Sequence, residues 1–179
     1  MESLEGQLLI AGPMVGGGMF RQAVILVVEH NSNGALGFTL NNALDTLVAE
    51  ADPSLAELSL FDERLYLGGP VQPNFVTAIA KQKDRLEASD SVLDRIVFIH
   101  PGEPEETAEK AAKVFIGYAG WAPGQLEGEL TQAGSWLVEP ARLEDVFCDS
   151  PESLWRDTVK RKGPSFAMLS TMPFDPTLN

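Results

Sequence analysis

Residues that perform acid–base catalysis are scarce in this sequence, which contains two histidines, His30 and His100. His30 follows Glu29 at the end of an apolar segment, and a glutamate beside a histidine can support proton transfer. Adjacent residues of a strand point to opposite faces, so these two side chains are not expected to share a site. We interpret His30 as a hydrogen-bonded structural histidine and His100, which precedes Pro101, as a solvent-facing loop residue.

Metal-ligand and nucleophile patterns are missing from the sequence. No two residues stand at the C-x-x-C or H-E-x-x-H spacing, so no metal site is expected. No serine lies in G-x-S-x-G. The single cysteine, Cys148, lies between Phe147 and Asp149, and this apolar, acidic setting disfavours a reactive thiolate. The sequence therefore predicts no catalytic nucleophile, and one cysteine leaves no partner for an intrachain disulfide.

The glycine run Gly16-Gly17-Gly18 superficially resembles a phosphate-binding loop. No Gly-Lys-Ser/Thr follows the run, and the pattern G-x-G-x-x-G fails at Arg21. A strand is expected after it, so the helix N-terminus that would hold a phosphate is missing. We interpret the run as a turning connection, and we expect no cofactor.

The charge balance limits the partners of the protein. The formal net charge is -13, which repels nucleic-acid phosphates and anionic lipid. Four cations do cluster, and the helix that they are expected to share explains them: Arg156, Lys160, Arg161 and Lys162. No apolar run approaches the roughly 20 residues of a membrane span. We expect a cytoplasmic protein without disulfides whose partner is a protein or a small molecule, not nucleic acid or membrane.

A β-hairpin is the firmest local prediction. Ala23–Glu29 is continuously apolar and β-branched up to its last residue, as in a strand buried on both faces. Asn33-Gly34 is a strong hairpin turn signal, and Ala35–Leu40 is the expected partner strand.

The remaining elements alternate between strand and helix patterns without internal repeats. Further strands are expected at Gly6–Ala11, Arg64–Leu67, Phe75–Ala80, Arg95–Ile99 and Ser135–Val138, and helices at Leu44–Ala51, Glu105–Ala112, Gln125–Gln132 and Glu152–Lys162. The pattern after Glu105 is ambiguous, because residues 113–118 become β-branched. Hairpins mixed with crossovers favour an α/β fold of the α+β type, a single domain over residues 1–179 with a curved mixed sheet covered by helices and a short tail over about the last eight residues.

The most unusual segment is Gly117–Glu127, where Tyr118 and Trp121 are separated by small residues and followed by a Pro-Gly turn. One interpretation is a groove floor with Gln125 and Glu129 as polar ends, since ligand pockets combine apolar walls with a few fixed polar groups. The other interpretation is a strand-to-helix corner that holds the core together.

These segments resemble the AlgH/YqgE family of bacterial and some plastid proteins. The matching pieces are Gly6–Ala11 with Pro13, Phe20 with Val24–Leu26, His30, Gly34–Gly37, Leu40-Asn41, Gly68–Val71, Gly117–Glu129 with positions 122 and 128 free, Trp136-Leu137 and Leu154–Arg156. The resemblance implies a compact α/β fold with a curved mixed sheet. It implies little about function, although one family name carries a transcriptional-regulator label.

Three polar positions depart from the family pattern. An aspartate that commonly follows the first Pro-x-Met is replaced by Gly16 and its neighbours, and Asn-Arg-Pro at the end of the hairpin is replaced by Asn41-Asn42-Ala43. A histidine that usually ends the next phenylalanine-rich strand is absent near Phe75. If these polar residues formed a family active site, this chain lacks it.

Three functions remain, and we prefer the first: a non-enzymatic binding or regulatory module acting through a protein or small ligand. The alternative is a hydrolase that uses His30 with Asn41 or Glu129, and the third is a direct DNA-binding regulator. The candidate binding residues are His30, Asn41, Gly68, Gly69, Pro70, Tyr118, Trp121, Gln125 and Glu129.

Overall fold

The predicted hairpin forms the centre of the sheet. β2 (Val24–Asn31) and β3 (Gly34–Thr39) pair antiparallel, with a register shift between Val27 and Glu29. Gly34 adopts a φ of 125°, which side chains with a Cβ rarely tolerate. A Cβ at this position would also collide with the carbonyl oxygen of Trp121. The turn therefore needs glycine both for its backbone angle and for the strand that passes beside it.

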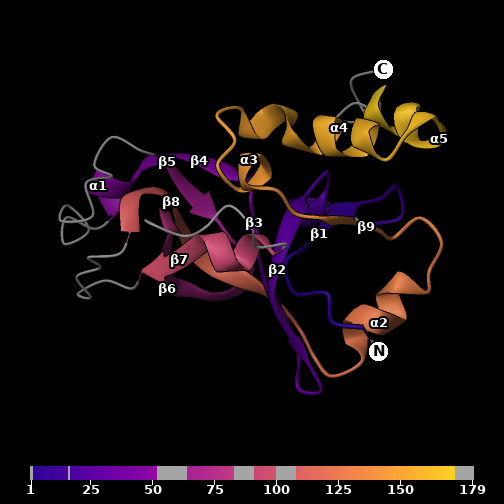
Figure 1. The fold of residues 1–179 in the computed structure, drawn as a ribbon, viewed down its shortest axis with the longest axis horizontal. Coiled ribbons are helices and arrows are strands. Elements are labelled where there is room, and N and C mark those ends of the chain that lie inside the picture. The colour runs from indigo at the N-terminus through magenta and orange to yellow at the C-terminus, as the bar shows by residue number, and fades with distance from the viewer. Residues whose placement is uncertain (1, 16, 52–63, 83–90, 100–107, 172–179) are drawn as a thin grey trace.

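The computed structural model describes residues 2–15, 17–51, 64–82, 91–99 and 108–171 (Figure 1). The remaining strands are β1 (Gln7–Ala11), β4 (Ala43–Leu47), β5 (Arg64–Leu67), β6 (Val71–Gln82), β7 (Ile96–Ile99), β8 (Ala108–Trp121) and β9 (Trp136–Pro140). The helices are α1 (Val48–Ala51), α2 (Gln125–Leu130), α3 (Leu143–Val146), α4 (Pro151–Arg161) and α5 (Pro164–Ala167). Short 3-10 turns lie at Gly18–Phe20, Val92–Arg95 and Leu169–Thr171.

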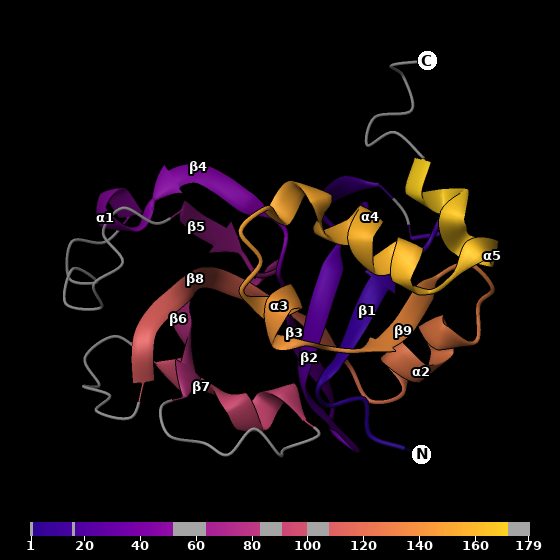
Figure 2. The ribbon, with the colours of Figure 1, turned by 45° about the horizontal axis from the view of Figure 1, so that its top comes forward.

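The strands form one mixed sheet in a single compact domain. Their order is β4-β5-β8-β3-β2-β1-β9, with β6 pairing both β7 and β8. β5 and β8 run parallel, whereas the other pairs are antiparallel. β8 joins the two parts of the sheet because it pairs with β5, β6 and β3 (Figure 2). The mixed α+β architecture expected from the sequence is confirmed.

Both faces of the β1–β2 region are buried, as the continuous apolar patterns predict. Leu8 and Ile10 belong to one core cluster with Trp155 of α4, whereas Leu9 belongs to the opposite cluster with Leu126 of α2. The helices accordingly lie on opposite sides of these strands (Figure 1). The indole N–H of Trp155 also donates to the carbonyl oxygen of Ala11 over 2.8 Å. The period of two along β1 thus directs alternate side chains to two helical layers.

Two helix predictions are wrong. Residues 44–47 lie in β4, which pairs with β5, and only Val48–Ala51 is helical. From Ala108 onward the predicted helix at 105–112 is strand β8, while residues 105–107 fall outside the described part of the chain. In both cases hydrogen bonding to neighbouring strands outweighs a weak local helix preference. His100 and the tail after residue 171 also fall outside the described residues.

Candidate functional site

A cavity of about 290 Å³ lies where the loop before β2, the end of β8, α2 and the start of β9 meet. We call it the aromatic cavity and define it by Phe20, Pro70, Trp121, Gln125, Glu129 and Trp136. Four of these residues were predicted as candidates: Pro70, Trp121, Gln125 and Glu129. Met14, which is 71% exposed, also lines the cavity.

The carboxylate of Glu129 is the polar centre of the aromatic cavity. Its Oε2 accepts the indole N–H groups of Trp121 over 3.1 Å and of Trp136 over 2.8 Å. Its Oε1 accepts an amide N–H of Gln125 over 2.9 Å. A carboxylate that receives three donors acts purely as an acceptor, which is the behaviour of the ionised form. Glu129 therefore places a negative charge against two tryptophan rings.

The turn after β8 explains why Gln125 and Glu129 face the cavity together. Gly124 adopts a φ of 74° as the residue before α2, a conformation that favours glycine. The side-chain oxygen of Gln125 accepts the backbone N–H of Ala122 over 3.0 Å. Residues four apart on a helix lie on one face, so the amide of Gln125 reaches Glu129 while it caps the turn.

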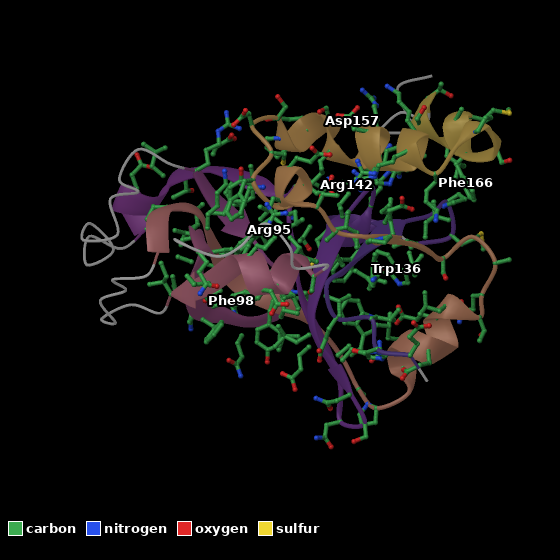
Figure 3. The ribbon with its side chains drawn as sticks, viewed as in Figure 1. Arg95, Phe98, Trp136, Arg142, Asp157 and Phe166 are labelled. Carbon is green, nitrogen blue, oxygen red and sulfur yellow. The ribbon has the colours of Figure 1, made fainter. Side chains whose placement is uncertain are left out.

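The three aromatic rings of the cavity meet at steep angles. The centroids of Phe20 and Trp136 lie 6.3 Å apart with an interplanar angle of 78°. Trp121 and Trp136 have the same centroid separation and an angle of 79°. Figure 3 places Trp136 between β9 and α2. Perpendicular rings are a favourable packing geometry, and here they form adjoining walls of a corner.

Tyr118 lines a different, more open depression of about 350 Å³. This depression also contains Glu29, Asn31 and Val71, and it shares Gly120 and Trp121 with the aromatic cavity. On β8, Tyr118 therefore lines only this depression, whereas Trp121 lines both the depression and the aromatic cavity.

The candidates Gly68 and Gly69 pack backbone against backbone. A Cβ at Gly68 would collide with the carbonyl oxygen of Gly117, and one at Gly69 would collide with the main chain of Tyr118. Gly117 itself has a φ of 64°. This close approach lets the chain cross β8 just before Pro70 reaches the aromatic cavity. Both glycines are therefore needed because they have no side chain to collide with β8.

His30 is buried and both of its ring nitrogens have partners. Its Nδ1 accepts the backbone N–H of Leu4 over 3.0 Å, so Nε2 carries the proton and donates it to Glu127 over 3.2 Å. The pKa of Glu127 is lowered, first by the backbone N–H of the same residue and then by His30. The lone pair that a general base needs is already used by Leu4. His30 is thus hydrogen-bonded through both ring nitrogens, and its structural role remains our interpretation.

Asn41 holds the opposite end of β2. It accepts the backbone N–H of Val24 over 2.9 Å and donates to the carbonyl oxygen of Gln22 over 2.9 Å. Val24 and His30 are six residues apart on one strand, which corresponds to about 20 Å. The structure therefore does not bring His30 and Asn41 together. The other proposed partner, Glu129, bonds to the indoles and to Gln125.

Sequence reasoning missed Phe20 and Trp136 in the cavity and Glu127 beside His30. Phe20 and Trp136 both belong to the family-like segments, and this signal could have identified them. Glu127 lies two residues from Glu129 on α2 and faces another way, as helical geometry requires. Among the described side chains, no three His, Cys, Asp or Glu residues group as a metal site would need. No described helix has the length and apolar character to cross a membrane.

Comparison with known sequences identifies the family of this chain. A model of the AlgH-like family matches residues 8–167. This chain belongs to the AlgH-like family. A UPF0301 protein of Chlamydia trachomatis is 36% identical over 183 residues, covering 98% of this chain and 95% of the relative. A UPF0301 protein of Streptomyces avermitilis is 34% identical over 188 residues, covering 100% of this chain and 97% of the relative.

Two solved structures resemble the fold of this family member. A crystal structure of a Corynebacterium diphtheriae protein has a TM-score of 0.79 at 26% identity and covers 96% of this chain and 94% of its own. The solution structure of the AlgH protein from Pseudomonas aeruginosa has a TM-score of 0.71 at 28% identity, with 96% and 95% covered. The family expected from the sequence motifs is thereby confirmed.

Proposed function

We propose that this protein is a non-enzymatic binding module that recognises a small ligand in the aromatic cavity. The observation that carries the proposal is the fixed arrangement of Glu129 with Trp121, Trp136 and Gln125. Binding sites pair apolar walls with a few oriented polar groups, and rings that are already held in place lose little freedom when a ligand enters. A regulatory effect of the ligand on a protein partner, in the cytoplasm, is part of the proposal.

The basic cluster on the last long helix supports a ligand or protein partner over DNA. Arg161 makes two hydrogen bonds of 2.9 Å to Asp145. Lys162 donates to Val138 and pairs with Glu139 over 3.0 Å. Cations that are engaged inside the protein are not available to neutralise phosphates. Two of the four clustered cations thus serve the fold.

The test uses the three tryptophans as reporters. A panel of neutral, cationic and anionic fragments is titrated into ¹⁵N-labelled protein, and the three indole N–H resonances are followed. Trp121 and Trp136 should shift together, while Trp155, whose N–H is buried against Ala11, should stay in place as an internal reference.

Two substitutions separate the neighbouring surfaces. Trp136→Leu should abolish the response, whereas Tyr118→Leu, which alters only the adjacent depression, should preserve it. Loss of binding in Tyr118→Leu but not in Trp136→Leu would move the site to that depression. A panel that leaves Trp121 and Trp136 unshifted would contradict the proposed function.

A further inference from the structure

Most side-chain hydrogen-bond donors around the aromatic cavity are directed at Glu129. The indole N–H groups of Trp121 and Trp136 and an amide N–H of Gln125 all go to its carboxylate. The hydroxyl of Ser135, which also lines the cavity, donates to the backbone carbonyl of Glu129. A ligand that entered would find these protons already hydrogen-bonded. The donors of the lining side chains that do not bond to Glu129 are the amide of Gln132 and the second amide N–H of Gln125, and both are neutral.

The lining of the aromatic cavity produces a negative electrostatic potential. The faces of aromatic rings carry the negative part of a quadrupole. Two of the three rings, Trp121 and Trp136, bond to the carboxylate of Glu129, and Phe20 packs against Trp136. Among its described lining residues there is no Lys, Arg or His. The net charge of -13 adds a long-range field of the same sign. An anion would be repelled here, and a cation would be attracted.

We propose that the aromatic cavity binds an organic cation, namely a methylated or free ammonium group carried by a small molecule. This inference rests on the proposed function and specifies the ligand class of the same site. Aromatic walls combined with a carboxylate are suited to ammonium groups, because a methylated ammonium is attracted to ring faces and a free ammonium can also donate to a carboxylate. Phe20, Trp121 and Trp136 all line the cavity, so such a group would contact more than one ring.

A hard metal ion fits the site less well than an ammonium group. Metal ions such as Ca²⁺ need six or more oxygen ligands, whereas the cavity offers one carboxylate, Glu129, whose two oxygens already accept N–H donors. A methylated ammonium group needs no such ligands, since its contact is with ring faces and the charge alone. The size of the cavity, about 290 Å³, suits a compact headgroup.

The experiment compares two ligands of one shape and different charge. Choline and its uncharged carbon isostere, 3,3-dimethylbutan-1-ol, are titrated separately into the ¹⁵N-labelled protein, with inorganic phosphate as the anionic probe. Choline should shift the indole resonances of Trp121 and Trp136, and the isostere should bind at least about tenfold more weakly. Phosphate should leave both resonances unchanged.

Matched variants test the source of the selectivity. Glu129→Gln should weaken choline binding about tenfold or more, whereas Glu127→Gln removes the same charge from the same helix outside the cavity and should change it less than twofold. Phe20→Leu removes one wall without touching the carboxylate and should weaken binding about three- to thirtyfold. The Trp155 resonance and thermal unfolding verify that each variant is folded. If Glu129→Gln does not fold, Phe20→Leu still tests the contribution of the aromatic walls.

The outcomes separate the two proposals. Equal binding of choline and its isostere, or binding of phosphate instead, would overturn the cation assignment and leave the aromatic cavity as a ligand site. Equal choline binding by folded Glu129→Gln and Glu127→Gln would also overturn the assignment. If choline, its isostere, phosphate and the wider fragment panel all leave Trp121 and Trp136 unshifted, the proposed function fails together with the inference.

Discussion

The indole N–H of Trp136 donates to Oε2 of Glu129 over 2.8 Å, linking the first residue of β9 to the last turn of α2. The same oxygen accepts Trp121, the last residue of β8. One acidic side chain thus connects three elements around the cavity, and its removal should have consequences for both stability and binding.

Replacing Glu129 by alanine should destabilise the protein by about 1–3 kcal/mol, because two indole N–H groups lose their acceptor. Urea unfolding followed by circular dichroism measures the change. Glu144→Ala is the matched control, since Glu144 is exposed and makes a surface ion pair with Arg142 that is worth at most about 1 kcal/mol. Equal losses in the two variants would show that the indole–carboxylate bonds contribute nothing beyond a surface contact.

Replacing Gly69 by alanine should cost about 3 kcal/mol or more, because the added methyl group would collide with the backbone of Tyr118. Gly128 in α2 offers the opposite case, since nothing lies within 4 Å of a Cβ built there. Gly128→Ala should stabilise by up to about 1 kcal/mol, the helix preference of alanine over glycine. Thermal and urea unfolding of both variants provide the comparison, and a tolerated Gly69→Ala would contradict the packing described for this crossing.

Burial lowers the pKa of Lys113, an effect that Cys148, 3.5 Å from its ammonium group, partly opposes. The folded pKa lies below the ordinary value of 10.5, so the unfolded chain binds more protons between these two values. The contribution of Lys113 to the free energy of unfolding should therefore rise with pH across that alkaline window.

Lys113→Met should remove this dependence. Urea unfolding of the wild type and the variant at several alkaline pH values gives the difference in free energy as a function of pH. That difference should move in favour of the wild type as the pH rises. A difference independent of pH would mean that the burial of Lys113 does not disfavour its charged form. The variant also loses the hydrogen bond from Lys113 to the carbonyl oxygen of Leu40, which lowers its stability by a constant amount at every pH.

The pKa of Glu127 is lowered in the folded protein, by its own backbone N–H and by His30. Its stabilising contribution should be fully present above the ordinary value of 4.5 and should be lost as the pH falls through the lowered value. Glu127→Gln should thus be less stable than the wild type at neutral pH, with a difference that shrinks on acidification. Acid-range unfolding curves of both proteins measure it, and a difference that grows toward low pH would contradict the assignment.

The parts of the fold that could be predicted are those in which local chemistry and tertiary pairing agree. Asn33-Gly34 specified the hairpin because its turn needs glycine, and the apolar run before it specified a strand buried on both faces. The segment after Ala108 could not be predicted in this way. Its alanines favour a helix locally, and the strand forms because β6 and, further along, β5 supply partners that are distant in sequence.

The candidate site shows the same division. Trp121, Gln125 and Glu129 lie within nine residues and could be recognised as one corner. Phe20 completes the cavity from the 3-10 turn before β2 and Trp136 from the start of β9, and no local spacing in the sequence indicates that they meet. His30 and Asn41 seemed compatible with one site because the sequence does not show that β2 separates them along its length.

The placement of β8 between β3 and β5 has a consequence during synthesis. β3 pairs with β2 on one edge and with β8 on the other. About 80 residues separate Thr39, where β3 ends, from Ala119, the first residue of β8 that pairs with β3. At about 5–20 residues per second, a ribosome needs roughly 4–16 s to produce that partner. For this interval the nascent hairpin presents one open edge, of the kind to which another chain could add a strand, and the arrival of Trp121 closes it.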